Sequence, residues 1–145
     1  MMDMRELPIY ESEIQAFVAQ FLSAFENLDM PAFSACISDH ATAFFPLPEP
    51  PLRVIGRPAI QRQFERVFEG IRKSAPSGPP FHRLNPCDLL IQGIDSTTAL
   101  VSFHLLNAER TARRSLVLIK SDGQWHILHL HASNGPASST PSSAT

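Results

Sequence analysis

Apolar residues in the first half of the chain recur with the spacing of amphipathic helices. From Ile14 to Leu28 they fall every three or four residues, which predicts one helix with a broad apolar stripe. We expect this helix to begin at Ser12, whose hydroxyl can cap the N-terminus while Gln15 reaches back as in a capping box. The apolar stripe is then expected to face the core.

Two further helices are indicated by the residues that open them. Asp29 is a suitable cap for a short helix that ends near Ser38, with Pro31 in its first turn, where a missing N–H costs little. Residues 56–58, with the sequence Gly-Arg-Pro, open a third helix. The apolar face expected for that helix consists of Ile60, Phe64, Val67, Phe68 and Ile71.

In the second half the pattern changes to runs typical of β-strands. Asp122-Gly123 predicts a two-residue hairpin turn, because both positions tolerate the positive φ of a type I′ turn. The expected strands are 81–92, 98–106, 113–121 and 125–133, with a short β-prone run at 41–45 before them. Helices followed by an antiparallel meander predict an α+β fold, with three N-terminal helices packed on a curved, mainly antiparallel sheet.

The hairpin turn also predicts which residues of its two strands share a face. Opposed residues lie on the same side of the sheet. One face is then expected to carry Lys120/Trp125, Leu118/Ile127, Leu116/His129 and Arg114/His131, and the other Ile119/His126, Val117/Leu128, Ser115/Leu130 and Arg113/Ala132. Because both faces are largely apolar and the helices can cover only one, we expect a second copy of the chain to cover the other, giving a homodimer or a larger assembly through the sheet.

Composition sets the domain organisation and excludes two classes of partner. Nine of the 13 prolines fall in two loops and a C-terminal stretch, so we expect an arm at 1–10, one domain at 11–134 and a flexible tail at 135–145. The 12 basic and 14 acidic residues give a net charge of −2, which argues against nucleic-acid binding. The start lacks a signal-peptide core, no apolar run approaches the length of a membrane span, and Cys36 and Cys87 form no disulfide framework. We therefore expect a cytoplasmic protein without membrane contact.

Two of the six histidines lie at a spacing that places them on one face of a strand. His129 and His131 should lie about 6.6–6.8 Å apart along that strand, with His104 on a neighbouring strand. They could form part of a metal site, but the only acid within a strand is Asp88. Hydrogen-bonded core or pocket histidines are therefore the favoured interpretation, and no metal or cofactor is predicted.

Arg114 is the candidate for binding an anion. If its face is the inner one, a buried guanidinium needs an anionic partner, and a small molecule with a carboxylate would supply one in bidentate geometry. Alternatively, Arg114 lies at the open end of the sheet with its head group in water. The sequence contains no GxSxG, GxxxxGK[ST] or GxGxxG motif, so its motifs indicate no particular enzymatic reaction.

The chain resembles the nuclear transport factor 2-like superfamily, which includes SnoaL-like polyketide cyclases. The resembling segments are residues 27–33, 41–46, 84–86 and 91–93, and above all Asp-Gly-Gln-Trp at 122–125 followed by His-Leu-His-Ala-Ser at 129–133. Within the superfamily it is most similar to the association domain of calcium/calmodulin-dependent protein kinase II, although that domain's strand arginine would fall at Leu116. The resemblance implies a cone-shaped α+β barrel around a pocket, with Trp125, Arg114, His129 and His131 facing inward.

Ketosteroid isomerase, in the same superfamily, needs a carboxylate base and a phenol. The matching positions hold Phe45 and Phe21, which can line a pocket but transfer no proton. We therefore expect a homo-oligomerising domain that binds a small molecule, most simply a carboxylate, through Arg114, His129, His131, Trp125, Phe21 and Phe45. The alternative is a SnoaL-like isomerase, cyclase or dehydratase that uses His129, His131 or His104 as its base.

Overall fold

The computed structural model describes residues 7–46, 53–75, 77–81, 83–106 and 110–136. The expected arm before residue 7 and the tail beyond residue 136 lie outside these ranges, as do Pro76 and the prolines within 47–52. The elements are α1 (Leu7–Glu26), α2 (Met30–Ala35), β1 (Ile37–Phe44), β2 (Val54–Ile55), α3 (Arg57–Ser74), β3 (Pro86–Asp95), β4 (Thr98–Leu106), β5 (Arg110–Ser121) and β6 (Gln124–Pro136).

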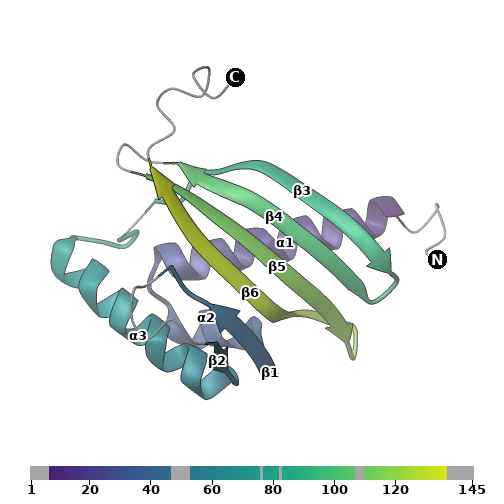
Figure 1. Ribbon diagram of the computed structural model, residues 1–145, viewed down its shortest axis with the longest axis horizontal. Helices are drawn as coiled ribbons and strands as arrows, with labels where there is room; N and C mark the ends of the chain where they lie inside the picture. Colours follow the sequence, from purple (N-terminus) through teal and green to yellow (C-terminus); the bar gives the residue numbers. More distant parts are fainter. Residues whose placement is uncertain (1–6, 47–52, 76, 82, 107–109, 137–145) are drawn as a thin grey trace.

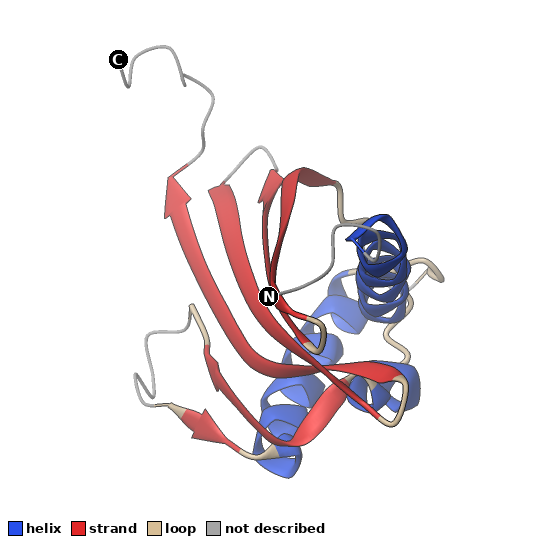
Figure 2. Cartoon of the chain, turned by 90° about the vertical axis from the view of Figure 1, so that its right-hand side faces the viewer, coloured by secondary structure: helices blue, strands red, loops and turns tan. Residues whose placement is uncertain are grey.

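The six strands form one mainly antiparallel sheet with the order β2-β1-β6-β5-β4-β3. Within the described strands, β1 and β6 pair in parallel and the other neighbours pair antiparallel. The sheet is strongly curled but does not close, and the helices lie on its concave side (Figures 1 and 2). The predicted α+β architecture is confirmed, with a cone that stays open between β2 and β3.

The helices match the prediction in number but differ at their ends. The first helix begins at Leu7 rather than Ser12, because contacts of Tyr10 with the sheet stabilise the additional turn. The Tyr10 ring meets Trp125 edge-on at 5.0 Å between centroids, and the Tyr10 hydroxyl donates a hydrogen bond to the Thr98 carbonyl. The second helix ends at Ala35 rather than Ser38, since the chain enters β1 at once.

The predicted cap of α2 is confirmed and can be tested. Asp29 Oδ1 accepts a hydrogen bond from the Ala32 backbone N–H at 3.2 Å. We expect Asp29→Ala to lower the free energy of unfolding by about 1 kcal/mol, because an orphan helix N–H loses its partner. Asp29→Asn should retain most of the stability, since asparagine is also a good cap. Equal urea midpoints for the alanine variant and the wild type would contradict this role.

The strands of the meander match the prediction more closely at β4 than at β3. The fourth strand has the predicted bounds, whereas β3 begins at Pro86 rather than residue 81, and β2 was not foreseen. The hairpin turn is confirmed, with φ of 52° at Asp122 and 78° at Gly123. Pairing next to the turn also follows the prediction, with Lys120 opposite Trp125.

Farther from the turn, a β-bulge overturns the predicted register. Leu118 still pairs with Ile127, but Val117 pairs with His129, so Leu128 is an extra residue in β6. Beyond it Leu116 faces Leu130, and Arg114 faces Ala132. The inner face therefore receives Leu130 and Ala132, and the predicted pairs Leu116/His129 and Arg114/His131 are wrong. The bulge buries two apolar side chains and keeps two imidazoles out of the core.

The core is built around phenylalanine rings from all three helices. Phe33 of α2 has no exposed surface. Its ring lies 4.9 Å from that of Phe21 and 4.5 Å from that of Phe64, between centroids. Phe25 and Phe68 pack on the same ring at 6.1 and 5.4 Å. This cluster fixes α1 and α3 relative to each other and so positions one end of the space between helices and sheet.

Candidate ligand pocket

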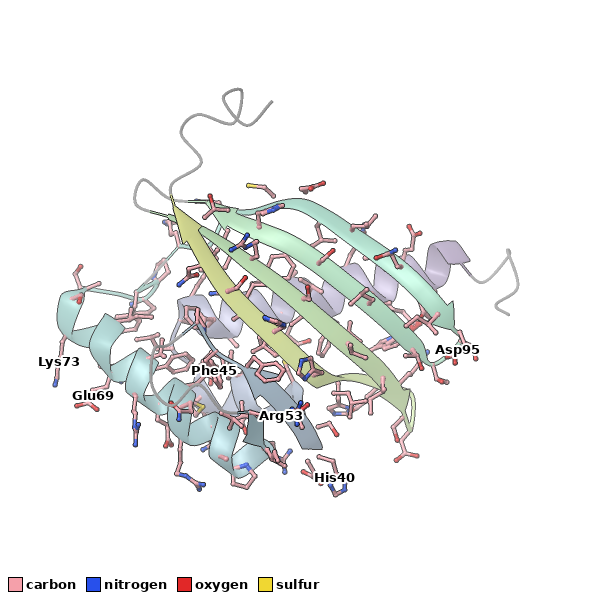
Figure 3. All side chains as sticks on the ribbon, viewed as in Figure 1. His40, Phe45, Arg53, Glu69, Lys73 and Asp95 are labelled. Carbon is pink, nitrogen blue, oxygen red and sulfur yellow. The ribbon has the colours of Figure 1, made fainter. Side chains whose placement is uncertain are left out.

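A cavity of about 410 Å³ lies between the concave face of the sheet and helices α1 and α3. Its size is within the range of small-molecule sites. Its aromatic wall consists of Phe21, Phe25, Phe45, Phe64 and Phe103, and its aliphatic wall includes Leu22, Val67, Leu84, Leu105, Leu116 and Leu130. Phe45 follows β1 and packs against Phe64 of α3, on the helix side of the sheet (Figure 3).

Arg114 is the charged residue in this otherwise apolar wall, with Asn134 also lining the cavity. It reaches the cavity because β5 turns alternate residues inward, and Leu116 and Ala112 lie on either side of it in the same row. Arg114 Nη1 donates hydrogen bonds to the Arg113 carbonyl at 2.9 Å and to the Ser133 carbonyl at 3.4 Å. Both partners are neutral backbone oxygens.

Partial burial is the main influence on the pKa of Arg114. Desolvation lowers the pKa of the Arg114 guanidinium to about 10, so the group still carries its charge at neutral pH. Among the described residues, no carboxylate forms an ion pair with Arg114. A half-buried charge without a counter-charge has lost part of its hydration without compensation. An anion that entered the cavity would offset this loss.

Of the predicted binding residues, the structure brings Arg114, Phe21 and Phe45 together around the cavity. Trp125 is on the predicted inner face but packs against Tyr10, away from the cavity lining. His129 and His131 are not in that lining either, because the bulge turns them to the outer face of the sheet. Their predicted inward orientation is therefore wrong.

His104, the remaining candidate base, is also on the outer face. It pairs with Cys87 on one side and with Arg113 on the other. One strand, β5, separates it from β6, so it does not join His129 and His131. Among the residues that the structure describes, no group of three or more potential metal ligands comes together. None of the described helices combines the length and the hydropathy that a membrane span requires.

Trp125 lines a second hollow, of about 560 Å³, between α1 and the β5–β6 hairpin. Glu13 crosses it, accepting hydrogen bonds from Lys120 Nζ at 2.8 Å and from Trp125 Nε1 at 3.3 Å. The hydrogen bond from Lys120 is the main reason that the pKa of the Glu13 carboxyl is lowered. We interpret Glu13, Lys120 and Trp125 as a structural link between α1 and the β5–β6 hairpin rather than as a ligand site, because the charges of Glu13 and Lys120 already pair with each other.

Sequence reasoning missed Asn134 and Phe103 as lining residues. The alternation of Phe103 and Leu105 along β4 was a usable signal for the inner face, since both line the cavity. Asn134 shares the face of Leu130 and Ala132, which only the shifted register reveals.

Three helices on one face of a curled, open sheet, with a cavity at their junction, define the cystatin-like or nuclear transport factor 2-like class of α+β folds. Residues 14–138 match the SnoaL-like domain, and the chain belongs to that family. The family and fold therefore agree with the resemblance seen in the sequence. The closer likeness to the kinase association domain stays a prediction.

Solved structures with the same fold include an NTF2-like protein of unknown function from Pseudomonas putida KT2440, with a TM-score of 0.67 and 21% identity over 85% of this chain and 84% of that one. A "Putative Scytalone Dehydratase" from Novosphingobium aromaticivorans gives a TM-score of 0.70 at 13% identity over 92% and 89% of the two chains. A "putative dehydratase" from the NTF2-like family of Streptomyces avermitilis gives 0.68 at 12% identity over 88% and 97%. Among curated proteins no relative matches the chain. These structural likenesses show the fold alone.

Proposed function

We propose that the domain binds a small monocarboxylate in the Arg114 cavity. The observation that supports this most directly is the guanidinium of Arg114, which lies half-buried in an apolar wall without an acidic partner among the described residues. A carboxylate can pair with the guanidinium in a bidentate manner while the phenylalanine rings take up an apolar body. Neutral molecules of the same shape would leave the charge unpaired.

The test is a thermal-shift screen with matched pairs of acids and amides. We expect aromatic monocarboxylates such as 2-naphthoate to raise the melting temperature in proportion to the logarithm of their concentration, and 2-naphthamide to have a much smaller effect. Equal stabilisation by the acid and the amide would show that the guanidinium does not select the ligand.

The alternative is a SnoaL-like isomerase, cyclase or dehydratase, and its support comes from the names of two structural relatives. Its proposed bases, His104, His129 and His131, do not line the cavity. Phe21 and Phe45 line the cavity at the positions that match the isomerase phenol and carboxylate, and neither side chain moves a proton. Binding without a histidine-based reaction is therefore the function we favour.

We also propose that a second copy of the chain covers the part of the outer face formed by β3, β4 and β5, in the cytoplasm. The apolar strip that supports this is smaller than the sequence indicated, because the bulge adds His129 and His131 to that face. Half-buried Leu100, Val117 and Ile119 remain, with Leu90 52% exposed beside them. The free thiols Cys36 and Cys87 agree with a reducing compartment.

Light scattering tests the assembly. The purified protein should show a mass of at least twice 16.1 kDa, and Val117→Lys should shift it toward the monomer, because an isologous contact repeats the new charge on both subunits. Ala19→Lys, on the exposed surface of α1, is the matched control and should leave the mass unchanged. A wild-type monomer at tens of micromolar would contradict the proposal.

A further inference from the structure

The outer face of the sheet carries a cluster of cation-forming side chains around one aromatic ring. Phe44, at the end of β1, is the centre of this cluster. The guanidinium carbon of Arg53 lies 5.1 Å from the Phe44 ring centroid. The rings of His129 and His131 lie 5.6 and 5.5 Å from it. Figure 3 looks onto this face, with α1 behind the sheet, and Arg53 lies beside β1.

The strand pairing explains why these groups meet. Parallel pairing of β1 with β6 places Phe44 beside His131 and Thr42 beside His129. Antiparallel pairing of β1 with β2 brings Arg53 alongside Phe44, since Val54 pairs with Ala43. The bulge in β6 is what brings both imidazoles to this face, and none of these residues lines the ligand cavity.

The cluster concentrates positive charge, and the part of the chain that the structure describes supplies no matching acid. Among the described residues no carboxylate pairs with Arg53, and Asp39 of β1 is already bound to Arg57 at 2.6 Å. From β5, the neighbours of His129 and His131 are Val117 and Ser115, which carry no charge. His126, farther along β6, and Arg113, farther along β5, are cations or potential cations on the same face.

The effect of this environment is visible at His129. Desolvation is the largest cause that lowers the pKa of His129, and the charges of His131 and Arg53 lower it further, against a smaller opposing hydrogen bond that the ring donates to the Thr42 backbone. His129 Nδ1 and Thr42 Oγ1 lie 2.7 Å apart, so the ring is held in place. An anion at this position would pair with Arg53 and at the same time remove the repulsion that opposes protonation of His129.

We propose that Arg53, His129 and His131 form an oxyanion site on the outer face that takes a phosphate group, either free phosphate or a phosphomonoester. A planar guanidinium and two imidazoles beside one ring offer several N–H donors, which suits a tetrahedral oxyanion better than a single carboxylate. The site is separate from the Arg114 cavity, so its occupancy is independent of the proposed carboxylate ligand.

Binding and protonation at this site must be reciprocal, because each changes the affinity for the other by the same factor. For a given charge state of the phosphate, binding should therefore be tighter when His129 is protonated than when it is neutral. In turn, saturating phosphate should raise the pKa of His129, and a tenfold preference of phosphate for the protonated ring corresponds to a rise of about one unit.

The experiment is an NMR titration of the histidine ring signals of the full chain with inorganic phosphate at pH 6.0 and constant ionic strength. We expect saturable shifts of His129 and His131 and a higher pKa of His129 at saturation. Arg53→Gln should weaken binding roughly tenfold, the loss of about one charge-assisted hydrogen bond. Arg66→Gln removes the same charge from the exposed surface of α3 and should have no effect. Arg53→Lys, which keeps the charge, should bind with intermediate strength.

Phenyl phosphate, run in parallel, distinguishes the two sources of the anion. Tighter binding than inorganic phosphate identifies a phosphomonoester as the natural form, and weaker binding identifies free phosphate. Shifts that stay linear in phosphate concentration, or that are the same in the wild type and Arg53→Gln, would overturn the proposal. Sedimentation at the NMR concentration shows whether phosphate changes the mass of the protein, and a response that appears only together with such a change would also contradict the proposal.

Discussion

We expect Arg114→Leu to abolish stabilisation by carboxylates and to make the unliganded protein more stable. The leucine keeps the apolar lining between Leu116 and Ala112 but removes a guanidinium whose burial is not offset by an ion pair among the described residues. We expect a gain of about 1–3 kcal/mol in the free energy of unfolding, in line with replacements of buried charged groups by apolar ones. For a chain of this size that corresponds to a rise in melting temperature of roughly 2–4 °C per kcal/mol. Differential scanning calorimetry with and without 2-naphthoate measures both effects.

Arg113→Gln is the matched control for this experiment. Arg113 is the neighbouring residue on β5, but it faces outward and donates to the Ser133 hydroxyl at 3.1 Å. Removing its charge should leave the response to carboxylates intact. If Arg113→Gln lost the response and Arg114→Leu kept it, the inner face of β5 would be assigned wrongly.

Phe33→Ala should produce the largest loss of stability of any change considered. The ring is fully buried and is enclosed by four other phenylalanine rings. Truncating such a side chain typically costs about 3–5 kcal/mol, because the apolar contacts are lost and a void remains. That is a large fraction of the roughly 5–15 kcal/mol that stabilises an ordinary domain.

Urea unfolding followed by tryptophan fluorescence measures this change, since Trp125 is buried in the folded state. Phe33→Leu, which keeps most of the volume, should cost less than about 1.5 kcal/mol. A loss below 1 kcal/mol for Phe33→Ala would mean that the cluster does not hold the three helices together. The same variant should weaken carboxylate binding, because Phe21 and Phe64 of the cavity wall pack on Phe33.

The fold was largely predictable because its local signals agree with one another. The helical spacing from Ile14 onward, the Asp29 cap and the Asp122-Gly123 turn each specify a piece of local structure that the fold retains. The exceptions are long-range. The early start of α1 depends on contacts of Tyr10 with Trp125 and Thr98, which lie far along the chain.

The site was predictable only where the register did not matter. Arg114 reaches the cavity under both registers, because the shift falls within β6 and leaves the faces of β5 unchanged. His129 and His131 depend on how many residues separate them from the turn, and one extra residue at the bulge moves every later side chain of β6 to the other face. Assigning faces by counting alternate residues from the hairpin turn therefore gives the wrong face for the residues of β6 beyond the bulge.

The sequence did contain a competing signal for the bulge. Leu130 and Ala132 are better core residues than two histidines, and both are buried in the structure. A count of apolar residues per face beyond Ile127 would have favoured the shifted register. The same shift reduced the apolar surface available for dimerisation and produced the cationic cluster around Phe44.

The central claim is that the Arg114 guanidinium selects a carboxylate inside the cavity. The most direct measurement is a calorimetric cycle in which 2-naphthoate and 2-naphthamide are titrated into the wild type and into Arg114→Leu. We predict that the acid binds the wild type at least about tenfold more tightly than the amide, and that this preference disappears in the variant, as expected for loss of a buried charge pair. A preference for the acid that survives in Arg114→Leu, or equal binding of acid and amide to the wild type, would contradict the account.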